Sequence, residues 1–215
     1  MYGGPGSYFV DLEENQKFIN AETDEVGKVE VTEEVLNANR EVIEAGDNRG
    51  RGISTFAAAN VWVQLPSERF RRYNGVAWQN SNDHCGSYAA AIALAYYQDY
   101  ANSDHVPTSI RTKNSTSPGT LITKLEALIE TGWGTLPGHV VGGVRKFLSN
   151  NGSSHYAQFT DFGTWDYVVH TVDRGRPIIV GLTSLAGSEY GNHWVTVYGY
   201  MENASGKGYY RCIDN

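Results

Sequence analysis

Cys85, one of only two cysteines in the chain, stands directly before an alanine-rich run that is typical of a helix. A thiol attacks as its thiolate, and its ordinary pKa of about 8.5 falls at a helix N-terminus or beside a histidine. Gly86 and Ser87 keep this end of the helix slim, which would give a substrate access to the sulfur. The pattern therefore favours a nucleophile at Cys85. Two other interpretations remain open, a buried structural thiol and a disulfide with Cys212.

His193 is the preferred candidate for a general base among the six histidines. It follows a glycine-containing loop and opens a strand-like run, a place where a side chain is held firmly yet stays exposed. Asp214 ends the following strand-like run and would orient the imidazole, with Asn215 as the alternative. Gln79 lies six residues before Cys85, and its amide would hold an oxyanion together with a backbone N–H.

Three further residues lie close to these candidates in the sequence. His84 is the rival base, but adjacent side chains at a helix start diverge, and no partner that would orient its ring is evident. Asp83 is interpreted as the N-cap of the helix rather than as a catalytic carboxylate. Cys212 stands two residues before Asp214, so strand alternation would put both side chains on one face. We therefore expect Cys212 near the site but without a part in the chemistry.

The elements that must position these residues come in two blocks, helices first and strands later. Helices are predicted from Cys85 to about Tyr100, from Pro118 with Ser117 as N-cap, over residues 139–150, and from Thr164. A short extended segment at 61–63 precedes them, and strands are predicted over 177–182, 193–201 and 209–214. The last two are joined by a tight turn and form an antiparallel pair. Separate blocks of helices and strands predict an α+β fold.

The bulk composition limits the partners. The chain has 215 residues, 40% of them hydrophobic, which is enough to bury one substantial core. A net charge of −7 argues against nucleic acid and against an anionic membrane surface as partners. No apolar stretch approaches the roughly 18 residues of a membrane span, and no signal peptide is visible. The two cysteines lack the spacing of a zinc site, and no metal or organic cofactor is expected.

Acidic residues divide the chain into two parts. Of the 24 acidic residues, 12 fall within the first 48 positions. We therefore predict an acidic N-terminal extension over residues 1–59, which contains an amphipathic helix from about residue 32, and one domain over residues 60–215. The extension is expected to be an arm docked on the domain. The alternative is a removable propeptide that contacts or blocks the cleft.

The candidate site residues, in this order and spacing, resemble those of the papain-like cysteine peptidases, and especially the bacterial branch related to the bacteriocin double-glycine leader peptidases. CGSYA at 85–89 resembles the branch's Cys-Gly-small start of an alanine-rich helix. HWVTVYGY at 193–200 is close to its HWVVVxGY strand, and DRGRPIIVGL at 173–182 is similar to its xxGxPVIVxx strand. The resemblance covers about residues 60–215. No single one of these motifs is specific for the family, and the resemblance rests on the pieces occurring together in the right order and spacing.

The resemblance implies a papain-like fold in which the nucleophile helix of an N-terminal helical half packs on a C-terminal antiparallel sheet. It also implies a peptidase that cleaves a polypeptide through a thioester acyl-enzyme. Cys85 would be the nucleophile and His193 the base, with Gln79 as oxyanion donor and Asp214 as the orienting residue. Relatives carry Trp-Gly shortly after that Asp or Asn, whereas this sequence ends at Asn215, so either the chain is trimmed or the third residue is less shielded.

The same site also fits other activities. A peptidoglycan amidase or endopeptidase, an acyltransferase, and an inactive binding domain of the same fold are the alternatives to a peptidase. Secretion or a cell-surface location is expected from the resemblance.

Overall fold

The computed structural model of the protein describes residues 60–80, 83–101, 103–130, 135, 137–153, 157, 165–182, 193–206 and 208–214. The acidic extension over residues 1–59 and the helix predicted within it lie outside the described residues. Across the described part of the chain, helices come first and an antiparallel sheet follows, so the predicted α+β class is confirmed.

The predicted helices of the domain are present, together with one that was not predicted, α2. In the described part of the chain the α-helices are α2 (Ser67–Phe70), α3 (Cys85–Tyr96), α4 (Leu121–Ile129), α5 (Pro137–Asn150) and α6 (Trp165–Asp173). Short 3₁₀ turns occur at Arg71–Tyr73, Val76–Trp78 and Ser103–His105, and α3 continues into a π-helical turn at Tyr97–Ala101. The helix predicted from Cys85 to about Tyr100 is therefore confirmed, with a wider last turn.

The strand β3 (His193–Glu202) is the centre of the sheet. It pairs antiparallel with β1 (Val63–Gln64), β2 (Ile178–Leu182) and β4 (Gly208–Ile213). Thr196 lies opposite Ile213, so the same register continued by one residue brings Asp214 opposite Val195. Alternate residues of a strand share a face, so Asp214 and the start of β3 come together on one side of the sheet.

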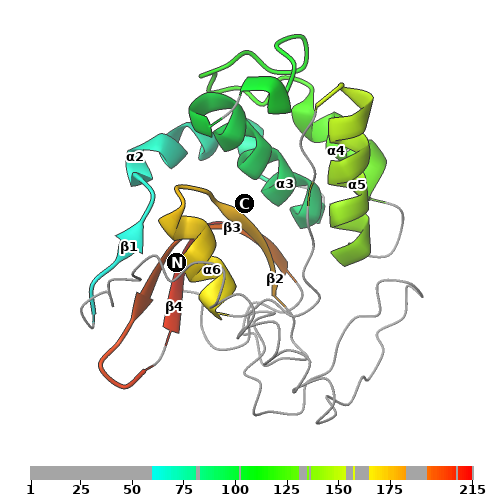
Figure 1. Ribbon diagram of the computed structural model, residues 1–215. Helices are drawn as coiled ribbons and strands as arrows, with labels where there is room; N and C mark the ends of the chain where they lie inside the picture. The colour runs from blue at the N-terminus through cyan, green and yellow to red at the C-terminus, as the bar shows by residue number, and fades with distance from the viewer. Residues whose placement is uncertain are drawn as a thin grey trace.

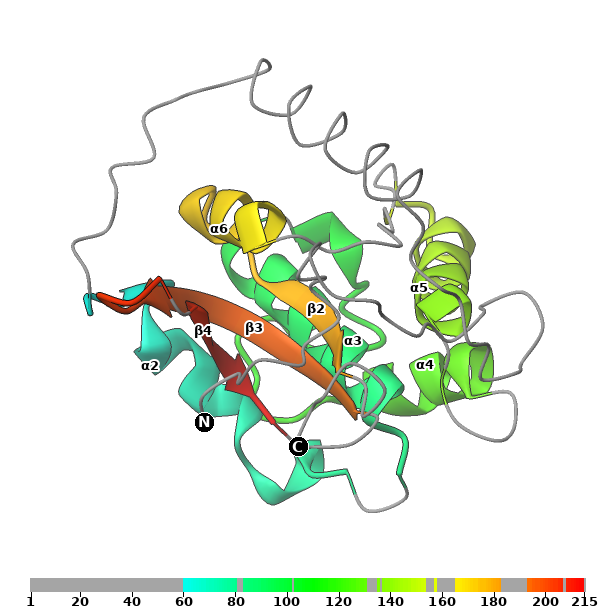
Figure 2. The same cartoon turned by 90° about the horizontal axis from the view of Figure 1, so that it is seen from below.

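Helices cover both faces of the sheet. The helices α3, α4 and α5 lie on one side of it and α6 on the other (Figures 1 and 2). Val195 and Val197 of β3 join the core under α6, whereas Trp194 and Tyr198 pack into the core around α3. This alternation is the period of two expected of a strand buried on both faces.

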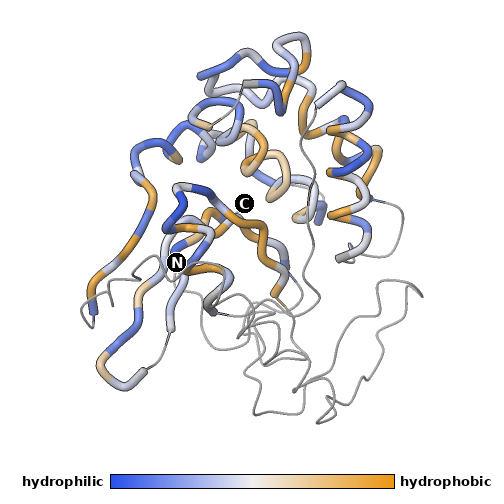
Figure 3. Tube along the Cα trace, in the orientation of Figure 1, coloured by the Kyte–Doolittle hydropathy of each residue, from blue (hydrophilic) through white to orange (hydrophobic). Residues whose placement is uncertain are grey.

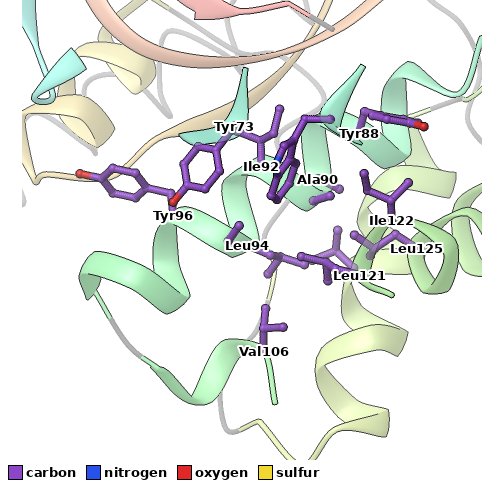
Figure 4. Close-up of a cluster of buried hydrophobic side chains, with 14 of the residues drawn as sticks. Tyr73, Tyr88, Ala90, Ile92, Leu94, Tyr96, Val106, Leu121, Ile122 and Leu125 are labelled. Carbon is purple, nitrogen blue, oxygen red and sulfur yellow. The ribbon is translucent and has the colours of Figure 1, made fainter. Parts of the chain in front are cut away.

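The helix α3, which begins at Cys85, is buried on all sides. Every one of its residues after Cys85 is buried, and six of them are alanine or glycine, which lets neighbouring backbones approach closely. Apolar side chains of α3, among them Ala90 and Leu94, lie beside Leu121 and Leu125 of α4 (Figure 4). The hydropathy colours show the same concentration of apolar residues on α3 and on the central strands (Figure 3). A helix without a polar face is typical of a core position, and it gives Cys85 a rigid support.

One hydrogen bond and one ion pair fix α3 further. The Thr196 hydroxyl of β3 donates to the Ala89 carbonyl at 2.8 Å, deep in the core. At the other end, the π turn places Asp99 against Arg111, whose guanidinium donates twice to the carboxylate at 2.9 Å. Burial alone would raise the pKa of Asp99, but hydrogen bonds from Arg111 and from the backbone N–H of Asn114 hold it below its ordinary value.

The start of α4 differs from its prediction. The sequence predicts Pro118 as the first helical residue, but α4 begins at Leu121. Gly119 has a positive φ of 58°, and the Thr120 N–H donates to the Ile110 carbonyl at 3.0 Å. The Ser117 hydroxyl accepts from the Gly119 N–H at 3.2 Å, so it caps this turn instead of the helix. A tertiary backbone contact thus delays the helix by one turn.

Candidate active site

Cys85 is the first residue of α3 and is half-buried. The preceding loop is held by the Asn80 side chain, whose Oδ1 accepts from the His84 N–H at 2.9 Å. The predicted N-cap role of Asp83 is wrong, because His84 occupies the N-cap position and Asp83 has a positive φ of 59°. The helix N-terminus therefore has no side-chain cap of its own, and the positive end of its dipole is directed at the segment that holds the sulfur.

His193 and Asp214 are brought together by the pairing of β3 with β4. The Nε2–H of His193 donates to Asp214 Oδ1 at 2.5 Å, and the two side chains are 20% and 22% exposed. The Cys85 side chain lies close enough to the His193 ring to raise its pKa. Because Asp214 occupies Nε2, Nδ1 is the ring nitrogen left for the sulfur. Three of the predicted site residues thus come together, with His193 between Cys85 and Asp214.

The electrostatics around His193 favour a charged imidazole. The hydrogen bond to Asp214 raises the pKa of His193 to about 9, and the interaction with the Cys85 side chain acts in the same direction, while burial opposes both. The ring therefore holds a proton at neutral pH. A protonated imidazole beside a thiol stabilises the thiolate, which is the attacking form of cysteine.

Gln79 follows the 3₁₀ turn at Val76–Trp78 and is exposed. Its backbone N–H donates to the Val76 carbonyl at 3.1 Å, and the neighbouring Trp78 is fully buried and donates its indole N–H to Thr116 O at 2.7 Å. The loop is thus anchored immediately before the amide that would hold an oxyanion. The role of Gln79 as oxyanion donor stays a prediction. Asn215, the alternative to Asp214 as the residue that orients His193, lies outside the described residues.

His84 has a partner that the sequence does not reveal. Its Nδ1 lies 3.0 Å from Glu126 Oε1 on α4, a helix that begins 37 residues further along the chain. The expectation that this ring lacks an orienting group is therefore wrong. The pairing engages His84 with α4, whereas the histidine whose pKa the Cys85 side chain raises is His193.

Cys212 lies on β4 opposite Val197, and neither cysteine forms a disulfide. The disulfide interpretation of Cys85 is thus excluded in this structure. Burial raises the pKa of Cys212 to about 11, and the nearby Asp214 carboxylate adds to the rise. Cys212 therefore remains a thiol at neutral pH and is a poor nucleophile.

Sequence reasoning missed a polar bridge beside Cys85. The Glu130 carboxylate accepts hydrogen bonds from the N–H and the hydroxyl of Ser87, at 3.2 and 2.6 Å, and from the Thr135 hydroxyl. The indole N–H of Trp194, the residue after His193, donates to the Thr135 carbonyl at 2.8 Å. No local sequence signal connects residues 43 and 59 positions apart.

Within the described ranges, no group of three or more histidine, cysteine, aspartate or glutamate side chains is arranged to hold a metal ion. The helices that the structure describes include none with the length and apolar character needed to cross a membrane.

A model of the Peptidase_C39-like family matches residues 73–211, well over half of the chain. The matched range contains Gln79, Cys85 and His193, and it ends three residues before Asp214. No curated protein and no solved structure matches the chain significantly.

Proposed function

The chain belongs to the Peptidase_C39-like family, with the α+β architecture of papain-like peptidases, and we propose that it is a cysteine peptidase with Cys85 as its nucleophile. One observation carries the proposal. The His193 ring is hydrogen-bonded to Asp214, and both Asp214 and the nearby Cys85 side chain raise the pKa of the ring. A cysteine, a histidine and a group that orients the histidine are the parts that thiol acyl transfer requires.

The proposed reaction has two halves. The Cys85 thiolate adds to the carbonyl carbon of a peptide bond, and the resulting oxyanion is held by the Cys85 N–H and the Gln79 amide. The tetrahedral intermediate collapses when the C–N bond breaks and His193 gives its proton to the leaving amine. The product of this half is a thioester on Cys85. His193, now neutral, takes a proton from water, whose oxygen attacks the thioester and releases the carboxylic acid and the thiolate.

Asp214 acts through His193 in this scheme. By accepting from Nε2–H it directs Nδ1 toward the sulfur, and its negative charge stabilises the imidazolium that faces the thiolate. The cost of separating charge between sulfur and ring is lowered because the partner is fixed before the reaction begins.

A thiol-directed epoxide tests this function directly. We expect the wild-type protein to be labelled on Cys85 at neutral pH and to lose that labelling in His193→Ala, with Cys212 unlabelled in both as an internal control. The substrate class follows from parallel incubation with a peptide library and with cell-wall fragments, with Cys85→Ala as the blank. Cleavage of peptides alone supports the peptidase. Cleavage of cell-wall fragments alone would assign the site to peptidoglycan instead, and absence of any Cys85 labelling would refute thiol catalysis.

For the acidic extension, we propose that residues 1–59 are an arm docked on the domain. The alternative is a propeptide that contacts or blocks the cleft and is removed by the domain itself. Intact mass of the expressed protein separates the two: an arm stays on both the wild type and Cys85→Ala, whereas a propeptide is lost from the wild type and kept by Cys85→Ala. A wild type that is active with its N-terminus intact contradicts the propeptide role. We further propose that the protein acts at the cell surface or outside the cell.

A further inference from the structure

We propose that Glu130 and Thr135 are positioning residues, which set the separation of Cys85 from His193 by bridging the nucleophile helix to the strand of the base. The inference rests on the proposed function, since it concerns the same pair of reacting groups. Its starting point is that Glu130 touches the turn of α3 that follows Cys85, while Thr135 touches Glu130 on one side and β3 on the other.

The helix end of the bridge joins a buried serine to a half-buried carboxylate. Ser87 is fully buried and donates both its N–H and its hydroxyl to Glu130 Oε1, at 3.2 and 2.6 Å. Hydrogen bonds to an ionised carboxylate are stronger and shorter than those between neutral groups. A carboxylate is also favourable beside the first N–H groups of a helix, where the dipole is positive. Glu130 therefore holds the first turn of α3, two residues from the nucleophile.

The strand end of the bridge is rigid. Thr135 donates its hydroxyl to the second oxygen of Glu130, and its carbonyl accepts from the Trp194 indole at 2.8 Å. Trp194 directly precedes the buried part of β3, and its ring lies across Gly181 of β2, where an added Cβ would stand only 2.9 Å from the ring. The indole is thus fixed by the sheet, and with it the backbone that carries His193.

Close packing adds to the hydrogen bonds. A Cβ built on Gly86 would come within 2.5 Å of the Thr135 methyl group, so the Thr135 side chain rests directly against the residue that follows Cys85. The bridge therefore runs from Gly86 and Ser87 through Glu130 and Thr135 to Trp194. Because each link is in contact with the next, a change in Thr135 is transmitted both to the sulfur and to the ring.

Two matched substitutions of Thr135 test the bridge. Thr135→Val keeps the shape of the side chain and removes its hydroxyl, whereas Thr135→Ser keeps the hydroxyl. The readout is the rate at which iodoacetamide alkylates Cys85 between pH 5 and 10, measured by mass spectrometry of the Cys85 peptide. This readout needs no peptide substrate. We expect Thr135→Val to slow alkylation at pH 6 by about tenfold, a typical effect of losing a hydrogen bond to a charged group, and to move the midpoint of the profile upward. Thr135→Ser should stay within about twofold of the wild type.

A third variant and a charge control complete the test. Trp194→Phe keeps most of the ring but loses the indole N–H, and it should shift the profile in the same direction as Thr135→Val. Glu68→Gln removes one exposed negative charge on α2 and should leave the profile unchanged. Far-ultraviolet circular dichroism verifies that each variant is folded. If Thr135→Val does not fold, the alkylation profile of Trp194→Phe tests the bridge in its place.

The outcomes separate this inference from the proposed function. If iodoacetamide alkylates Cys85 at pH 6 no faster in the wild type than in His193→Ala, the thiolate site itself is refuted. If Cys85 of the wild type is reactive and both Thr135→Val and Trp194→Phe have the same alkylation profile, the bridge is refuted, even where these variants unfold at a lower temperature. The peptidase proposal then remains intact.

Discussion

The imidazole of His193 and the carboxylate of Asp214 form a 2.5 Å hydrogen bond across two adjacent antiparallel strands. The bond leaves Nδ1 for Cys85, and together with the Cys85 interaction it raises the pKa of His193 to about 9. This one contact therefore decides both where the ring points and over which pH range it carries a proton.

The first prediction concerns the alkaline side of the activity profile. If the imidazolium is needed to protonate the leaving amine, kcat/KM of the wild type should fall as the pH rises through about 9. Asp214→Ala removes the hydrogen bond and the charge, so the fall should move toward neutral pH, with a loss of about tenfold or more at pH 8. Asp214→Asn keeps a hydrogen-bond acceptor but loses the charge, so the pH at which its activity falls should lie between those of the wild type and Asp214→Ala. Identical alkaline limbs in all three proteins would contradict the role of Asp214.

Local sequence patterns predicted the elements that carry this contact. The alternation of HWVTVYGYM and the short apolar run at 177–182 predicted strands, and the tight turn before residue 209 predicted an antiparallel pair. Once those strands are paired, the ends that hold His193 and Asp214 must meet, so their proximity was predictable from topology. The start of α3 at Cys85 was equally evident from its alanine-rich run.

Contacts between distant helices were not predictable from the sequence. The His84 partner Glu126 belongs to α4 and the Ser87 partner Glu130 directly follows it, and their contacts with the start of α3 arise from the angle at which the two helices pack. Helix propensity carries no information on that angle. The delayed start of α4 has the same origin, since a backbone contact with Ile110 overrides a favourable Ser-Pro start.

The second prediction is a pH-dependent stability. The pKa of His193 is about 9 in the folded protein against an ordinary value of 6.5, so the folded state binds the proton more tightly. The resulting stabilisation is fully present below pH 6.5 and is lost as the pH rises to about 9. Its size is on the order of 3 kcal/mol. Chemical denaturation at pH 6 and pH 9.5 should show a larger loss for the wild type than for His193→Ala. Equal losses would mean that the proton is not bound more tightly on folding.

The third prediction concerns the buried ion pair beneath the Gln79 loop. Arg111 and Asp99 are fully removed from solvent as side chains, and the Arg111 guanidinium lies over the rings of Tyr73 and Trp78. Arg111→Met leaves the Asp99 charge buried without its main partner, which should lower the free energy of unfolding by about 3–5 kcal/mol. Lys113→Met, an exposed change two residues away, should alter it by less than about 0.5 kcal/mol. Urea denaturation measures both, and a similar small effect in the two variants would refute a structural role for the pair.

The fourth prediction compares two glycines in helices. A Cβ on Gly86 would stand 2.5 Å from the Thr135 methyl and 3.2 Å from Val140, whereas a Cβ on Gly142 of α5 would meet nothing within 4 Å. Alanine favours a helix over glycine by up to about 1 kcal/mol, so Gly142→Ala should stabilise the protein slightly. Gly86→Ala gains the same propensity but must displace Thr135, and we expect a net destabilisation of about 1–3 kcal/mol.

The same pair separates packing from catalysis. Gly86 adjoins Cys85, and Thr135 is hydrogen-bonded to Trp194 on the strand that carries His193. Gly86→Ala should therefore also slow alkylation of Cys85 at neutral pH, while Gly142→Ala should not. Thermal denaturation and the alkylation rate of each purified variant provide the two readouts. If Gly86→Ala is as stable and as reactive as Gly142→Ala, the first turn of α3 has room that the structure does not show, and close packing cannot be what holds Cys85 in register with His193.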